Sequence, residues 1–170
     1  NRLKAVFVIL NSMKEPDHNC PQKEIDEYHA LKCFINNDGE RFDNNLCSKG
    51  AEEPVDLEYG GTKYQITYGD QTKEGQFRKM MNRSNNGLMY RSTQLEDWPQ
   101  LILQDALQKK SKMDGKGVTL LIKCTSTGPH SLSDYQKMLP EFLESNSSLR
   151  GTWDDIFVVF LNGNVRVTNT

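Results

Sequence analysis

Residues 116–130 read Lys-Gly-Val-Thr-Leu-Leu-Ile-Lys-Cys-Thr-Ser-Thr-Gly-Pro-His, and the fold that the sequence predicts depends on this stretch. The apolar run Val118–Ile122 is typical of a strand buried on both faces. The run ends at Lys123 and Cys124, and a loop of small residues follows. Apolar side chains then recur at helical spacing from Leu132 to about Ser145. A buried strand therefore delivers a cysteine into a tight loop at the start of a helix.

This strand, loop and helix predict an anion site. Free backbone N–H groups and the helix dipole point at whatever lies at the N-terminus of a helix. A thiol in the same place ionises more easily than a thiol in water. Cys124 is thus the first candidate for a functional residue.

Length and composition limit the class of protein. A chain of 170 residues is long enough for one domain with a substantial core. Its net charge of -2 does not mark it as a nucleic-acid binder, and no apolar run approaches the roughly 20 residues of a membrane span. The chain begins at Asn1 rather than Met, so we expect an excerpt of a longer protein. We expect its four cysteines to be reduced thiols and the domain to be cytoplasmic.

The remaining patterns predict an α/β fold with a central mixed β-sheet flanked by helices. Residues 3–10 form a second apolar run, which we expect to lie beside 118–122 in the sheet. Residues 55–68 alternate apolar and polar side chains, as half-buried antiparallel strands do. We expect one domain over residues 1–170, with a loop or insertion around 11–54. The further expected elements are a helix at 22–35, a surface loop at 36–54, strands at 76–81 and 87–92, and a helix at 100–113.

Imidazole and thiol side chains gather in the first third of the chain, which raises the question of a zinc site. Their spacing matches no tight zinc signature such as paired C-x-x-C knuckles. We therefore expect no metal and no cofactor, with half-buried thiols and solvated imidazoles in their place. The residues concerned are His18, Cys20, His29, Cys33 and Cys47.

From Tyr64 onward, the order of motifs resembles the later part of a classical protein tyrosine phosphatase domain. A strand meander leads to Trp98-Pro99-Gln100, similar to the Trp-Pro-Asp loop of that family. After a helix and the buried strand, Cys124-x5-His130 is similar to the family's Cys-x5-Arg loop. Residues 155–157 are similar to the start of a late helix, which favours a helix there. The resemblance implies a phosphatase-like fold with these anion-binding loop residues: Thr125, Ser126, Thr127, Gly128 and Ser131.

The departures from the family pattern concern the chemistry. The resemblance puts the nucleophile at Cys124, the phosphate-gripping arginine at His130 and the general acid at Gln100. One imidazole cannot reproduce the five-donor fork of an arginine, and an amide cannot donate a proton as a general acid. Pro129 has no N–H to offer an anion. The resemblance therefore implies a pseudophosphatase, a catalytically inactive module that binds or regulates a protein partner, with tyrosine-phosphorylated partners included.

Two alternatives remain open at this stage. The domain could be a working cysteine-dependent phosphatase that uses Cys124. In that case His130 would serve either as a base or as a contact to the phosphate. The domain could also be an unrelated α/β interaction domain whose resemblance to the phosphatases is accidental. The backbone around Cys124 distinguishes the two phosphatase-like hypotheses from the unrelated α/β domain. Only a phosphatase-like domain, active or inactive, requires a backbone cradle that closes on the start of the helix.

Overall fold

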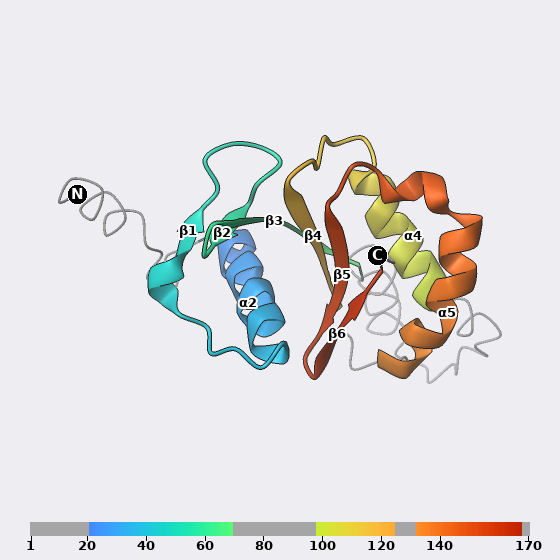
Figure 1. Ribbon diagram of the computed structural model, residues 1–170, viewed down its shortest axis with the longest axis horizontal. Helices are drawn as coiled ribbons and strands as arrows, with labels where there is room; N and C mark the ends of the chain where they lie inside the picture. The colour runs from blue at the N-terminus through green and yellow to red at the C-terminus, as the bar shows by residue number, and fades with distance from the viewer. Residues whose placement is uncertain (1–20, 70–97, 125–131, 168–170) are drawn as a thin grey trace, which may run out of the picture.

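The computed structural model describes residues 21–69, 98–124 and 132–167, which form three layers around a six-stranded mixed sheet (Figure 1). The helices are α2 (Gln22–Asn37), α4 (Trp98–Lys110) and α5 (Leu132–Ser145), with 3-10 turns η1 (Asn44–Leu46) and η2 (Ser147–Arg150). The strands are β1 (Cys47–Lys49), β2 (Leu57–Tyr59), β3 (Thr62–Tyr68), β4 (Val118–Lys123), β5 (Asp155–Phe160) and β6 (Gly163–Arg166).

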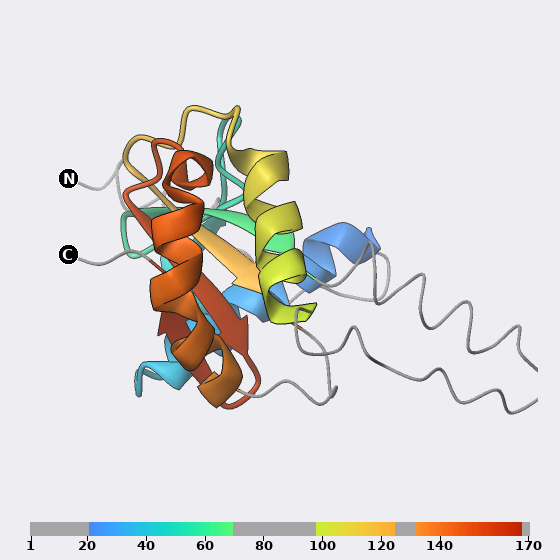
Figure 2. The same ribbon diagram turned by 90° about the vertical axis from the view of Figure 1, so that its right-hand side faces the viewer.

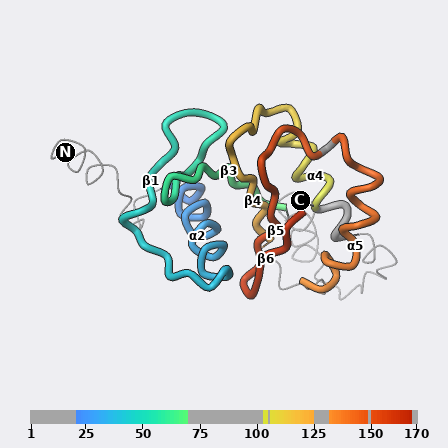
Figure 3. Tube along the Cα trace, in the orientation of Figure 1, coloured from blue at the N-terminus to red at the C-terminus, as the bar shows by residue number. Residues whose placement is uncertain are grey.

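The strands lie in the sheet in the order in which they occur in the chain, from β1 to β6. Strands β1, β2 and β3 pair antiparallel, β3, β4 and β5 pair parallel, and β6 returns antiparallel to β5. Each parallel connection passes through a helical segment, α4 before β4 and α5 before β5, as the tube in Figure 3 shows. Parallel neighbours require such crossovers, because the chain must return to the same end of the sheet.

Helix α2 covers one face of the sheet, while α4 and α5 cover the other (Figure 2). Strand β4 supplies both cores: Leu121 packs with α2, and Leu120 and Ile122 pack with α4 and α5. All three side chains are fully buried. The prediction of a central strand covered on both faces is confirmed.

Helix α2 follows from the spacing of its apolar residues. Tyr28, Leu31, Phe34 and Ile35 recur at helical intervals and are buried against the sheet. Gly39, just beyond the helix, has φ 85°, a left-handed conformation that glycine adopts without strain at a helix end. The helix predicted for 22–35 is confirmed. Its apolar face is part of the core.

Three other predictions from local pattern are confirmed. The alternating segment 55–68 contains the antiparallel pair β2 and β3. The helix predicted after Pro99 is α4, and the helix predicted from Leu132 to about Ser145 is α5. Within the described residues, no helix is long and apolar enough to cross a membrane.

The pairing of β4 contradicts the prediction that residues 3–10 lie directly beside 118–122. These residues lie outside the described part of the chain, but both edges of β4 are occupied. Strand β3 pairs with β4 over 63–68 and β5 pairs with it over 155–159. No edge of 118–122 is therefore open to the N-terminal run.

Two further predictions need correction. Residues 155–157, expected to begin a helix, begin strand β5, in which Ile156 and Val158 face one core and Val159 the other. The period of two decides for a strand. The loop predicted for 36–54 contains η1 and the edge strand β1, whose three residues are too few for a sequence pattern. The strands predicted at 76–81 and 87–92 lie outside the described residues.

Replacing Gly115 by alanine should destabilise the fold by about 1–3 kcal/mol. A Cβ at this buried glycine would lie 2.2 Å from Cε3 of the Trp153 ring, which is itself buried in the core. Neither the ring nor the backbone can yield without loss of packing. Denaturant unfolding measures the effect, with the exposed neighbour Lys116→Ala as a control expected within about 0.5 kcal/mol of the parent. Equal stabilities for the two variants would contradict the close approach.

Candidate functional site

The predicted phosphatase-like site is only partly described by the structure. Strand β4 ends at Lys123, Cys124 follows, and α5 begins at Leu132, as the sequence pattern predicts. Most of the proposed anion cradle, comprising Thr125, Ser126, Thr127, Gly128, His130 and Ser131, lies outside the described residues. Trp98, Pro99 and Gln100 form the first turn of α4, and the structure does not describe their side chains.

Cys124 itself is a core residue. It is 4% exposed, its Sγ lies 3.7 Å from Oη of Tyr135 on α5, and its backbone N–H donates to Val159 O. A thiol packed in this way has little access to a substrate. The position that the resemblance assigns to a nucleophile thus contributes to the packing of α5 on β4.

The described histidine and cysteine side chains of the first third of the chain do not form a zinc site. His18 and Cys20 lie outside the described residues, His29 is exposed, and Cys47 is buried in the core. Among residues 21–69, 98–124 and 132–167, no group of three or more His, Cys, Asp or Glu side chains could hold a metal. Cys33, Cys47 and Cys124 form no disulfide with one another.

A polar site that the sequence analysis missed lies where β2 leaves the edge of β3. The two strands pair only from Leu57↔Tyr64 to Tyr59↔Thr62, so β3 continues without this partner from Gln65 to Tyr68. Asp56 takes the place of the missing strand. Its backbone N–H donates to Tyr64 O at 2.9 Å, and its Oδ2 accepts the Ile66 N–H at 2.7 Å. The carboxylate thereby satisfies a donor on an open sheet edge.

Gln65 holds the same carboxylate from β3. Its Nε2 donates to Asp56 Oδ2, and the side chain is 2% exposed. Its other amide atom, Oε1, is buried and has no hydrogen-bond partner in the described structure. An orphaned buried acceptor is costly, and it indicates a place where a donor or a cation would be stabilised.

Helix α2 brings a second carboxylate to this place. Glu27 is 7% exposed, and burial, together with the nearby charge of Asp56, raises the pKa of its carboxyl. Lys23 Nζ lies 3.2 Å from Glu27 Oε1, an ion pair that opposes this shift, yet Oε1 has no well-aligned hydrogen bond. Burial likewise raises the pKa of Asp56, against the hydrogen bond from Ile66. Both carboxylates are therefore held in surroundings that penalise their charge.

Helix α4 contributes a lysine. Lys110 is partly buried, and burial lowers its pKa, although Asp56 acts in the opposite direction. It lines a cavity of about 370 Å³ with Lys23, Asp26, Glu27, Ile66, Thr67 and Tyr68. We call this cavity, together with Asp56 and Gln65 beside Ile66, the polar notch. The cavity itself holds Asp26 and Glu27 with Lys23 and Lys110, and Asp56 and Gln65 adjoin it through Ile66.

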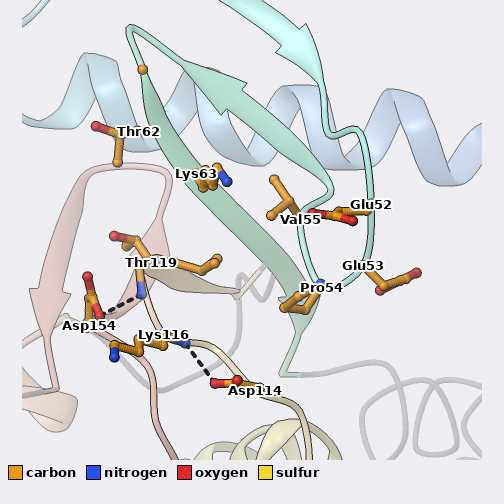
Figure 4. Close-up of a pocket in the computed structure, with 13 residues that line it drawn as sticks. Glu52, Glu53, Pro54, Val55, Thr62, Lys63, Asp114, Lys116, Thr119 and Asp154 are labelled. Carbon is orange, nitrogen blue, oxygen red and sulfur yellow. Dashed lines mark hydrogen bonds between the residues drawn. The ribbon is translucent and has the colours of Figure 1, made fainter.

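A second cavity lies at the other end of the parallel strands, at the start of β3 and β4 (Figure 4). Its acids already have backbone donors: Asp154 Oδ1 accepts the Gly117 N–H at 2.8 Å, and Asp114 Oδ1 accepts the Lys116 N–H at 3.3 Å. Its charged residues, such as Lys116 and Glu53, are exposed. These carboxylates shape turns, so the polar notch is the stronger candidate site.

The sequence did contain a signal for the notch. Glu27 lies four residues before Leu31, on the apolar stripe of the predicted helix, where an acid is out of place. Gln65 lies between Tyr64 and Ile66 in a strand whose three central residues are all buried. An acid and an amide at buried positions indicate a polar function, but only the fold brings them together.

No protein-family model, curated protein or solved structure matches this chain. The described residues show an α/β fold with a mixed sheet and flanking helices.

Replacing Glu27 by glutamine should stabilise the domain near pH 7 by about 0.5–2 kcal/mol, because it removes a buried charge. The folded-state pKa of Glu27 lies above its ordinary value of 4.5. The parent protein therefore loses stability as the pH rises from the ordinary pKa through the raised folded-state pKa, because the buried carboxyl becomes charged. The advantage of the variant should shrink toward about pH 4, where the parent carboxyl is protonated. Thermal unfolding at several pH values measures this.

Glu24→Gln is the matched control, since Glu24 lies on the same helix but pairs with Lys49 at the surface. Its effect should stay within about 1 kcal/mol of zero and favour the parent. A Glu27→Gln variant that is less stable than the parent at pH 7 would mean that the charge is not penalised.

Proposed function

We propose that the polar notch binds a divalent cation of the magnesium type and, with it, a phosphate-bearing ligand. The observation that carries this proposal is Gln65 Oε1, a buried acceptor without a hydrogen bond, together with the buried carboxylate of Glu27 and the neighbouring Asp56 carboxylate. Oxygen atoms of carboxylates and amides are the ligands that hard cations prefer. A cation beside these acids would offset the repulsion between Glu27 and Asp56.

The small number of protein oxygens favours a cation that is shared with a bound phosphate over a cation that is coordinated by the protein alone. Asp26 also lines the cavity, but the acids of the described residues form no group of three that could hold a metal by itself. Magnesium is commonly held by one or two carboxylates, several waters and the phosphates of a bound substrate. Lys23 and Lys110 line the same cavity and would contact the remaining phosphate charge. This proposal replaces the sequence-based expectation of no metal.

The chemistry open to such a site is metal-assisted hydrolysis of a phosphate ester. A bound cation lowers the pKa of its water and polarises the phosphoryl group. The residues of the chain would orient the ligand: Asp56 is fixed by Gln65 and Ile66, and Lys110 approaches from α4. A phosphodiester such as bis(4-nitrophenyl) phosphate therefore belongs in the test beside cation binding.

Asp56→Asn should weaken cation binding at least about tenfold, or about 1.4 kcal/mol. The amide keeps the shape of the side chain but loses the charge that attracts the ion. Calorimetric titration with MgCl₂ and MnCl₂ measures the affinity. Affinity for the parent should fall as the pH drops toward the raised pKa values of Glu27 and Asp56, since protonated carboxyls do not bind cations.

Asp154→Asn is the control, because Asp154 also accepts a backbone N–H but lies at the other end of the parallel strands. It should bind cations as the parent does. Parent protein that binds neither cation would refute the cation site. If the phosphodiester is bound or hydrolysed equally well with and without the cation, the cation has no role in holding phosphate.

The pseudophosphatase reading is a second candidate, supported by the order of β4, Cys124 and α5. We propose on this reading that the loop after Cys124 binds a phosphotyrosine-containing protein partner without hydrolysing it. The burial of Cys124 supports the loss of catalysis. The three described cysteines form no disulfide with one another, in agreement with a cytoplasmic location, which forms part of the same proposal.

On this second reading, hydrolysis of 4-nitrophenyl phosphate should not exceed that of a Cys124→Ser variant. Binding of a phosphotyrosine peptide should be stronger at about pH 5.5 than at about pH 8, because protonated His130 would carry the charge. His130→Arg should tighten it by up to about 1.5–3 kcal/mol. Hydrolysis of 4-nitrophenyl phosphate that requires Cys124 would show that the domain is catalytically active. Equal affinities for the phosphotyrosine peptide at both pH values would show that the loop after Cys124 does not bind the phosphate through His130.

A further inference from the structure

A buried lysine faces a thiol between α2 and the sheet. Lys123, at the end of β4, is 5% exposed, and its Nζ donates to Cys33 Sγ of α2 at 3.3 Å. This sulfur is the one hydrogen-bond acceptor of Lys123 Nζ within the described residues. An ammonium in such a place needs a strong acceptor, and a neutral thiol is a weak one. A sulfur atom that gains negative charge is the matching partner.

The sulfur is also oriented. Cys33 Sγ–H donates to Phe160 O at 3.0 Å, and Asn37 Nδ2, which also donates to Phe160 O, lies 3.7 Å from the sulfur. Cys33 is partly exposed, in contrast to Cys47 and Cys124, which are buried. Burial raises the pKa of the Cys47 thiol to about 11. Access and an adjacent cation thus coincide at one described cysteine.

We propose that Cys33 is a peroxide-sensitive thiol activated by Lys123. In the reaction, the sulfur attacks one oxygen of hydrogen peroxide and the O–O bond breaks. Cys33–SH and H₂O₂ give Cys33–SOH and H₂O, so the sulfur is oxidised by two electrons and the peroxide is reduced. The thiol proton ends on the departing hydroxide. The Lys123 ammonium stabilises the negative charge that passes from the sulfur to the departing hydroxide, and it can relay the thiol proton to that hydroxide.

The experiment uses the whole chain with Cys20→Ser, so that the cysteine outside the described residues does not react. Hydrogen peroxide is added with a 1,3-diketone that traps sulfenic acids, and peptide mass spectrometry follows labelling at each cysteine with time. Cys33 should label at least about tenfold faster than Cys47 and Cys124. Labelling of Cys47 or Cys124 as fast as Cys33 would overturn the proposal.

Lys123→Met tests the activation, because methionine keeps much of the stem and removes the charge. Labelling of Cys33 should slow at least about fivefold, while an unchanged rate would overturn the role of Lys123. Circular dichroism checks folding of the variant. If Lys123→Met unfolds, Lys123→Gln replaces it, with the same two outcomes. Asn36→Ala, at an exposed position on the same helix, should leave the Cys33 rate unchanged.

Discussion

Strand β4 has a hydrogen-bonded neighbour on each edge and a hydrophobic core on each face, and the rest of the structure depends on this complete burial. Its parallel neighbours require crossover segments, and its two faces require cover. Helix α2 covers one face of the sheet, and helices α4 and α5 cover the other. The antiparallel strands β1 and β6 then complete the margins of the sheet, where shorter and more polar segments suffice.

The polar notch arises where this cover ends. Strand β2 pairs with three residues of β3, so the rest of that edge needs another partner. The Asp56 carboxylate serves as that partner for the Ile66 N–H. A side chain in place of a strand leaves room beside the sheet, and it puts a charge there. Glu27 and Lys110 then meet the same space from opposite faces, which neither helix alone would produce.

The sequence predicts the elements of this protein better than their arrangement. The run 118–122 and the helix from Leu132 depend on patterns within a few residues, and both are found. The place of 3–10 beside β4 is predicted from its apolar run alone, and pairing between distant strands leaves no local trace. For 155–157 the resemblance to the phosphatases favours a helix although the apolar run itself is ambiguous. The notch joins residues 27, 56, 65 and 110, so only the sheet order reveals it.

The buried polar residues of the described structure argue for function more strongly than for stability. They are Glu27, Gln65 and Lys123. The first two belong to the polar notch, and the third faces Cys33. Apolar side chains of similar size in such positions are often neutral or stabilising, so packing alone does not explain them. Both clusters include α2, which carries Glu27 and Cys33 two turns apart. One helix that buries a face of the sheet therefore also contributes a residue to each of these two polar clusters.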